Sequence, residues 1–213
     1  MSSSKTLTGL VLAIIFSIEA AAFALTSHID SHNRFILQGK PFFPLGLYVA
    51  QCPADGQSSQ LNDIANSPFD TLMNYSVNNG SDSQITHYLD ELHSRKLKLI
   101  FSLKEYIGHG RTDLATISHK VKTFGGHPSI ISWYLNDELS PEYLPALEVG
   151  YQKVRELDAN HPVWSVHWNR NWLVKEAHTT DIVGVDPYPV DNKPITLLSR
   201  CSSPYAARCW QHR

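Results

Sequence analysis

The chain has 213 residues, of which 42% are hydrophobic and 18% charged, and its formal net charge is −2. The near balance of 18 basic and 20 acidic side chains lacks the basic surplus typical of nucleic-acid-binding proteins, so no nucleic-acid partner is expected. The sequence contains no run of about 18 or more uncharged apolar residues, which argues against a membrane-spanning protein. A single soluble globular domain is the class that remains.

Residues 1–24 have the pattern of a secretory signal peptide. Lys5 supplies a positive charge, residues 10–18 form a short apolar core, and residues 22–24 (Ala-Phe-Ala) form a small-x-small cleavage site. The alternatives are a buried helix or a membrane anchor, and Glu19 together with the short apolar run disfavours an anchor. We therefore expect a secreted, extracellular protein that has no membrane attachment after the signal peptide is removed.

Beyond the signal peptide, short apolar runs alternate with helical patterns. In chain order, the sequence predicts a strand at 42–49, a helix around 61–66, a strand at 69–75, a helix over 85–92, a strand at 97–103, a helix over 114–124, a strand at 129–135, a helix over 140–154, and strands at 162–168 and 181–188. The runs are almost continuously apolar, as in parallel strands buried on both faces. Their starts lie roughly 20 to 32 residues apart, which is the length of a βα unit.

This rhythm predicts an α/β fold, either a (β/α)8 TIM barrel or a doubly wound sheet. Polar and aromatic residues gather where the predicted strands end: Tyr48, Asn74, Tyr75, Lys104, Glu105, Asp137, Glu138, His167, Trp168, Asp186 and Tyr188. In a barrel these ends meet on the face that carries active sites. We therefore favour the TIM-barrel type, with about six βα units present.

Cofactor and metal motifs are missing from the sequence. No Gly-x-Gly-x-x-Gly turn and no Gly-Lys-Ser/Thr motif occurs, so no nucleotide cofactor is expected. The histidines show neither His-x-His nor His-Glu-x-x-His spacing, so no metal site is expected. A Gly-x-Ser-x-Gly nucleophile elbow is also absent, which sets aside an unrelated α/β hydrolase.

Glu138 is the main candidate for chemistry. It follows a buried strand, and Asp137 precedes it. Two adjacent carboxylates near apolar Trp133 and Tyr134 oppose one another's ionisation, which raises the pKa of at least one and suits a general acid. The alternative is an acidic pair that stabilises a helix N-terminus and has no catalytic part.

The segment from His127 to Glu138 resembles the acid/base segment of clan A glycoside hydrolases, most closely the family 2 β-glycosidases. The pattern of that family is His-Pro-Ser-Ile-Ile-x-Trp-x-Leu-Gly-Asn-Glu, and the matching positions are His127, Pro128, Ser129, Ile130, Ile131, Trp133, Leu135 and Glu138. Residues 34–43 resemble the stretch that leads into the first barrel strand, and residues 181–188 resemble the sixth-strand segment. The resemblance covers residues 34–190, which implies a partial glycoside hydrolase domain there.

The resemblance implies hydrolysis of O-glycosidic bonds in a carbohydrate substrate by the retaining mechanism, with Glu138 as acid/base. Asp137 stands where the family has Asn, which contacts a sugar hydroxyl, and an ionised Asp accepts a hydrogen bond but cannot donate one. The further candidates for sugar binding lie at strand ends: the aromatic Trp168 and Tyr188, and the polar His167 and Asp186. Their alternative role is ordinary packing at the barrel rim.

The family nucleophile, a Glu at the end of the seventh strand, has no counterpart in this sequence. Residues 191–213 show no helical or strand period and are expected to be an irregular or aberrant tail, which suggests a barrel truncated at its C-terminus. Glu105 and Asp186 are the other strand-end carboxylates, and neither stands at the nucleophile position. We therefore expect weak or no turnover. A non-catalytic carbohydrate-binding remnant is the alternative function.

Overall fold

The computed structural model describes residues 26–56, 58–108, 111–186 and 209–210. Its centre is a parallel sheet with the strand order β12-β11-β10-β9-β6-β5-β4. The six main strands are β4 (Gly46–Val49), β5 (Thr71–Asn74), β6 (Lys98–Ser102), β9 (Ile130–Asp137), β10 (Val163–His167) and β11 (Ile182–Val185). They confirm the six predicted strands, and β9 runs two residues further than expected.

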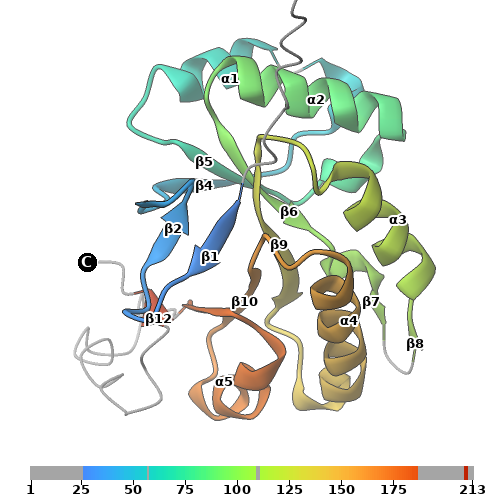
Figure 1. The fold of residues 1–213 in the computed structure, drawn as a ribbon. Helices are drawn as coiled ribbons and strands as arrows, with labels where there is room; N and C mark the ends of the chain where they lie inside the picture. The colour runs from blue at the N-terminus through green and yellow to red at the C-terminus, as the bar shows by residue number, and fades with distance from the viewer. Residues whose placement is uncertain (1–25, 57, 109–110, 187–208, 211–213) are drawn as a thin grey trace, which may run out of the picture.

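Helices connect the successive strands of this sheet and lie along one side of its curled surface (Figure 1). They are α1 (Ser58–Ala65), α2 (Asp82–Ser94), α3 (Leu114–Phe124), α4 (Leu144–Leu157) and α5 (Arg170–Glu176). Short 3-10 turns accompany them at η1 (Pro53–Asp55), η2 (Val77–Asn79), η3 (Lys104–Tyr106), η4 (Pro141–Tyr143) and η5 (Ala177–Thr179). Among the described residues, no helix is both long and apolar enough to cross a membrane. The alternation of parallel strands and helices is that of a partial (β/α)-barrel, which confirms the predicted fold class.

Two of these helices differ from the prediction. The segment that begins at Ser140 and Pro141 forms the 3-10 turn η4, and α4 starts three residues later, at Leu144. Helix α5 is not predicted at all. Asn169 begins it, because its side chain accepts hydrogen bonds from the backbone N–H groups of Asn171 and Trp172 and so satisfies donors that lack a partner within the helix.

Each face of the sheet packs into its own hydrophobic cluster, because successive side chains of a strand point to opposite faces. Leu99 and Phe101 of β6 join the outer cluster against the helices, whereas Ile100 between them joins the inner cluster. The inner cluster consists of Phe35, Met73, Ile100, Ile131, Tyr134, Val166 and Ile182. Burial of both faces explains why the strands read as continuous apolar runs.

A small antiparallel sheet, which the sequence does not predict, lies against the inner face (Figure 1). Its strands are β1 (Ser27–Ile29), β2 (Phe35–Leu37) and β3 (Lys40–Pro41). Phe35 places its ring in the inner cluster. Ser27 Oγ donates to Ile131 O at 2.6 Å, and Ser27 N donates to Asn160 O at 2.8 Å. The small sheet therefore covers the amino ends of the central strands.

Two short strand pieces complete the described structure. β7 (Ile107–Gly108) and β8 (Arg111–Thr112) pair antiparallel after β6. β12 (Cys209–Trp210) pairs parallel with β11, where Val183 is opposite Cys209. Cys209 and Trp210 are the part of the expected tail, residues 191–213, that the structure describes. A two-residue strand is too short to show a period in the sequence, which is why the pattern did not reveal it.

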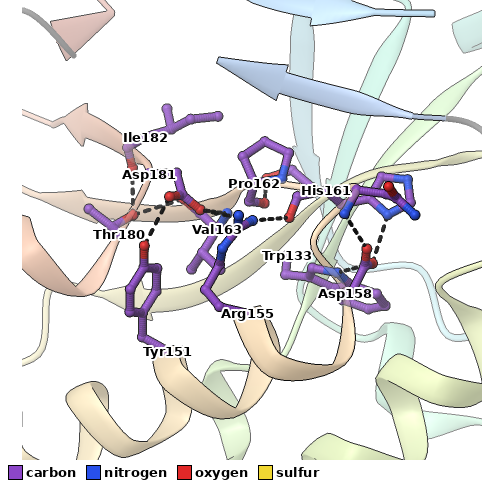
Figure 2. Close-up of polar contacts among 12 residues, drawn as sticks. Trp133, Tyr151, Arg155, Asp158, His161, Pro162, Val163, Thr180, Asp181 and Ile182 are labelled. Atoms are coloured by element: carbon purple, nitrogen blue, oxygen red, sulfur yellow. Dashed lines mark hydrogen bonds and ion pairs between the residues drawn. The ribbon is translucent and has the colours of Figure 1, made fainter. Parts of the chain in front are cut away.

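A polar network, which we call the amino-end network, joins α4 to the starts of β10 and β11 (Figure 2). The Asp181 carboxylate accepts from Tyr151 Oη at 2.9 Å and from Val163 N at 2.8 Å. Asp158 accepts from Trp133 Nε1 at 2.8 Å, and its Oδ2 lies 2.7 Å from His161 Nδ1. The network lies at the end of the sheet opposite to the strand-end carboxylates, where a barrel is expected to hold residues that stabilise the fold.

Candidate functional site

At the carboxyl ends of the strands, five side chains from four neighbouring strands form one group, which we call the carboxyl-end cluster: Tyr48, Tyr75, Lys104, Tyr134 and Asp137. The rings of Tyr48 and Tyr75 stack with centroids 5.5 Å apart. Lys104 Nζ lies 4.2 Å from the centroid of the Tyr75 ring and forms an ion pair with Asp137. Tyr134 Oη donates to Asp137 Oδ1 at 2.7 Å. The cluster thus combines aromatic faces with an ion pair, a combination suited to polyhydroxylated ligands.

The charges around this cluster act on its phenols. Burial raises the pKa of Tyr75 above its ordinary value, and the negative charges of Asp137, Asp186 and Glu138 act in the same direction. Burial likewise raises the pKa of Tyr134. Both phenols therefore keep their protons at neutral pH and remain hydrogen-bond donors. Asp137 ends β9, and the backbone N–H groups of Glu138 and Asp186 donate to Val166 O and His167 O of β10, so all three acidic residues lie at one end of the sheet.

An irregularity in β9 decides which way its last residues face. Trp133 packs in the outer cluster and Tyr134 in the inner one. Pairing with β10 then skips Leu135, because Trp164 is opposite Tyr134 and Ser165 is opposite Asn136. Leu135 and Asn136 consequently both face the helices, and Asp137 turns to the inner side, where it meets Tyr134. This extra residue is a β-bulge, a feature that re-aims side chains near active sites.

Glu138 follows the bulge with a backbone φ of 61°, the left-handed region that residues other than glycine seldom adopt. Its N–H continues the strand pairing by donating to Val166 O at 3.0 Å. The side chain is half-buried. A left-handed conformation costs about 1–2 kcal/mol for a residue with a Cβ atom. Strain of this kind is typical of functional positions.

Hydrogen bonds on both sides of Leu139 hold this backbone turn. Leu139 N donates to Asn136 Oδ1 at 2.9 Å, and Leu139 O accepts from His167 Nε2 at 2.9 Å. Asn169 N donates to the other ring nitrogen of His167 at 3.1 Å. The ring therefore carries its proton on Nε2. His167 is buried beside α5, where its ring meets Trp172 edge to face with centroids 5.3 Å apart.

The other predicted sugar-binding residues are spread along the rim. Trp168 is 46% exposed, and its ring centroid lies 5.9 Å from that of Trp172. Asp186 is half-buried, and its N–H donates to His167 O at 3.2 Å. Tyr188 lies outside the described residues. The structure thus gathers Asp137, Glu138 and Asp186, whereas Trp168 lies beside α5 and His167 behind the Glu138 turn.

Sequence reasoning gave no role to Lys104, Tyr48 or Tyr75, although their positions at strand ends were visible. It treated Asp137 both as a sugar-binding residue and as a carboxylate whose charge acts on Glu138. The structure pairs Asp137 with Lys104, so that a positive charge offsets the negative one. Within the described part of the chain, no group of three His, Cys, Asp or Glu side chains is arranged to hold a metal ion.

Comparison with known proteins supports the fold. No family model matches the chain, and no curated protein matches it. A β-D-glucuronidase from Dictyoglomus thermophilum superposes with a TM-score of 0.58 at 15% identity, over 82% of this chain and 35% of that one. A family 2 β-galacturonidase from Eisenbergiella tayi superposes with a TM-score of 0.62 at 12% identity, over 82% of this chain and 34% of that one. A β-1,4-D-mannanase from Cryptopygus antarcticus superposes with a TM-score of 0.55 at 10% identity, over 76% of this chain and 71% of that one.

These likenesses show a shared architecture, the barrel found in glycoside hydrolase family 2 structures. They confirm at the level of the fold the resemblance seen in the segment that ends at Glu138. The chain spans 35% of the glucuronidase and 34% of the galacturonidase, so it corresponds to part of such proteins.

Proposed function

We propose that this chain is a glycoside hydrolase-like protein whose site lies at the carboxyl ends of the strands, with Glu138 as the acid/base residue. The observation that carries this proposal is the placement of Glu138. It follows the bulge of β9 in a left-handed conformation and lies beside the Lys104–Asp137 pair. A barrel presents its reacting groups at this end, and the neighbours in fold are glycosidases.

In the retaining mechanism Glu138 donates its proton to the glycosidic oxygen while a second carboxylate attacks the anomeric carbon, and the C–O bond to the leaving group breaks. The ionised Glu138 then takes a proton from water, which attacks the same carbon and releases the carboxylate. Asp137 accepts a hydrogen bond from a sugar hydroxyl, and the exposed face of Tyr48 packs against the C–H groups of a sugar ring.

The second carboxylate is expected about 5–5.5 Å from Glu138. Of the strand-end carboxylates that the structure describes, Glu105 already accepts bonds from Ser102 Oγ at 2.9 Å and Asn78 Nδ2 at 3.1 Å. Asp186 lies at the end of β11, which is not the strand that carries the nucleophile in the family. We therefore propose that turnover by this chain is weak or absent.

Release of a chromophore from a panel of aryl β-glycosides tests the assignment. Any turnover by the purified chain is expected to fall at least a hundredfold in Glu138→Gln, because general acid catalysis contributes about 10²–10⁴. Glu156→Gln, which neutralises a glutamate whose side chain is 62% exposed on α4, is the matched control and is expected to change nothing. Turnover that survives Glu138→Gln would remove Glu138 from the mechanism.

A non-catalytic carbohydrate-binding protein is the second candidate, and the exposed Trp168 ring beside Trp172 favours it. Calorimetric titration with soluble β-glycans is the measurement. Trp168→Ala is expected to weaken binding at least tenfold, whereas Val174→Ala, at a residue 61% exposed on α5, is expected to leave it unchanged. Binding without turnover supports this candidate, and binding that is indifferent to Trp168→Ala contradicts the role of this ring.

We also propose that the protein is secreted and that residues 1–24 are removed. These residues lie outside those that the structure describes, so the proposal rests on the sequence pattern alone. N-terminal sequencing of the protein recovered from the medium of a secreting host is expected to start at Leu25. Recovery of the chain only inside the cells, with Met1 retained, would contradict secretion.

A further inference from the structure

Glu176 is a carboxylate buried where no cation neutralises it among the described residues. It ends α5 and is 3% exposed. The imidazole of His167 is close by: its Nε2 lies 3.9 Å from Glu176 Oε2 and donates its proton to Leu139 O. Burial raises the pKa of Glu176 above its ordinary value. Burying a carboxyl group lowers the stability of the fold unless hydrogen bonds compensate for the lost contact with water.

The contact that Glu176 makes is with the side-chain amide of Asn136. Asn136 Nδ2 donates to Glu176 Oε2 at 2.8 Å, and both side chains are buried. The two residues line a small cavity of about 10 Å³ between α5 and the carboxyl end of β10, together with Ser165 and His167. Because Asn136 is 1% and Glu176 3% exposed, the bond is shielded from bulk water, which strengthens it.

This bond settles which way the Asn136 amide points. The Glu176 Oε2 atom accepts a hydrogen bond, so it draws the NH₂ group of Asn136 toward α5. The amide oxygen is then left facing the Glu138 turn, where it accepts from Leu139 N at 2.9 Å. In the flipped amide, the NH₂ group would face the Leu139 N–H, and two donors would oppose one another.

We propose that Glu176 is a positioning residue. Its carboxylate orients the Asn136 amide, and Asn136 together with His167 holds the turn that keeps Glu138 in its left-handed conformation. The proposal rests on the proposed function only in calling Glu138 catalytic, because the hydrogen-bond chain from α5 to the turn is independent of any reaction.

Two substitutions of similar volume separate the positioning role from simple packing. Glu176→Gln keeps an oxygen that accepts from Asn136 Nδ2, whereas Glu176→Met fills the space without an acceptor. Glu156→Met is the control, because it makes the same change at an exposed position of α4. The measurement is the hydrogen-exchange rate of the Leu139 amide in the full chain. The reference is the amide of Trp133 in β9, which donates to Pro162 O of the neighbouring chain segment at 3.0 Å.

The Leu139 amide is expected to exchange about five- to tenfold faster in Glu176→Met relative to Trp133, the loss expected from one hydrogen bond. Glu176→Gln is expected to restore the rate to within about twofold, and Glu156→Met to leave it unchanged. Equal changes at Leu139 and Trp133 would mean that Glu176 only stabilises the fold, and an unchanged Leu139 rate in Glu176→Met would also overturn the proposal.

A measurement on the unsubstituted chain covers the case in which Glu176→Met does not fold. The side-chain NH₂ protons of Asn136 are expected to exchange at least tenfold more slowly than those of the exposed Asn160. Equal rates would show that the Asn136 amide is not fixed and would overturn the proposal. Neither readout uses a sugar, so protected amides in a chain without glycosidase activity would reject the proposed function and leave the positioning role supported.

Discussion

Asp158 Oδ2 lies 2.7 Å from His161 Nδ1, and both side chains are buried at the amino end of the sheet. The same oxygen accepts from Trp133 Nε1 at 2.8 Å. One carboxylate thus ties the end of α4 to the start of β10 and to the central strand. Removing the carboxylate of a buried pair leaves the groups that bonded to it, here the His161 ring and Trp133 Nε1, without an equivalent acceptor. We predict that Asp158→Asn lowers the free energy of unfolding by about 3 kcal/mol.

Urea denaturation of Asp158→Asn checks this value. Asp63→Asn removes a carboxylate from the exposed face of α1 and is the control, for which a change within about 0.5 kcal/mol is expected. A loss in Asp158→Asn no larger than that of the control would show that the amino-end network does not stabilise the fold.

The pKa of Asp158 leads us to expect that the fold loses stability in acid. Burial opposes the ionisation of Asp158, but the hydrogen bond and charge of His161 and the bonds from Trp133 and Asn160 outweigh it. The pKa of Asp158 therefore lies below its ordinary value of 3.8. A carboxylate with a lowered pKa contributes stability above its unfolded pKa, and this stability is lost as the pH falls through the folded pKa.

We therefore expect the free energy of unfolding to fall as the pH drops below about 4. The slope over this range is expected to be shallower in Asp158→Asn than in the unsubstituted chain. Thermal unfolding followed by circular dichroism from pH 7 to pH 2 measures both slopes. Parallel curves for the two proteins would contradict the lowered pKa.

The Lys104–Asp137 pair is predicted to be coupled. Each side chain is 25% exposed, so part of the interaction is screened by water, and a coupling free energy of about 1 kcal/mol is expected. A double-mutant cycle with Lys104→Met and Asp137→Asn measures it from the unfolding free energies. Additive effects would show that the pair contributes nothing, and a cycle repeated in 1 M NaCl is expected to give a smaller coupling.

The left-handed backbone of Glu138 predicts a reversal of the usual ranking of alanine and glycine. Both Glu138→Gly and Glu138→Ala remove the carboxylate, but only glycine relieves the Cβ contacts at a φ of 61°. We expect Glu138→Gly to be about 1 kcal/mol more stable than Glu138→Ala. Glu148, in the middle of α4, gives the contrast, because there glycine is expected to be about 1 kcal/mol worse than alanine. The same sign at both positions would contradict the strained turn.

Gly184 is predicted to tolerate no side chain. A Cβ atom there would lie 2.6 Å from Val166 Cγ2 and 3.0 Å from Trp164 Nε1, and a β-branched neighbour gives way poorly. Gly184→Ala is expected to lower the melting temperature through a loss of about 1–3 kcal/mol. A Cβ atom on Gly126 would meet nothing within 4 Å, so Gly126→Ala is expected to be neutral. Equal effects of the two substitutions would contradict the close packing of β10 on β11.

The strands and most helices could be predicted from the sequence because each βα unit leaves a local signal. Residues 99–101 of β6 form a continuous apolar run, since Leu99 and Ile100 face different clusters. Elements without such a signal were missed. Strands β1 to β3 are too short to show a period, and α5 exposes most of its residues, so it carries no apolar stripe that would mark a helix.

The site was predictable in position but not in its contacts. Strand-end residues such as Tyr75 and Lys104 are visible in the sequence, because parallel strands bring their carboxyl ends together. The pairing of Lys104 with Asp137 depends on the direction of the Asp137 side chain, and this direction follows from the bulge at Leu135. The role proposed for Glu176 depends on its contact with Asn136 of β9, which lies 40 residues earlier in the sequence. No sequence pattern encodes such a contact.

The bulge at Leu135 decides which of two neighbouring side chains reaches the carboxyl-end cluster. With strict alternation over the same residues, Asn136 would face the inner side and Asp137 would face the helices. The carboxylate would then lie away from Lys104, and the amide would lie away from Glu176. Deleting Leu135 would remove the bulge but keep both directions, because a single residue would then separate Tyr134 from Asp137. The Lys104–Asp137 pair is therefore expected to survive the loss of Leu135, whereas a change that straightens the strand at its full length would take the pair apart.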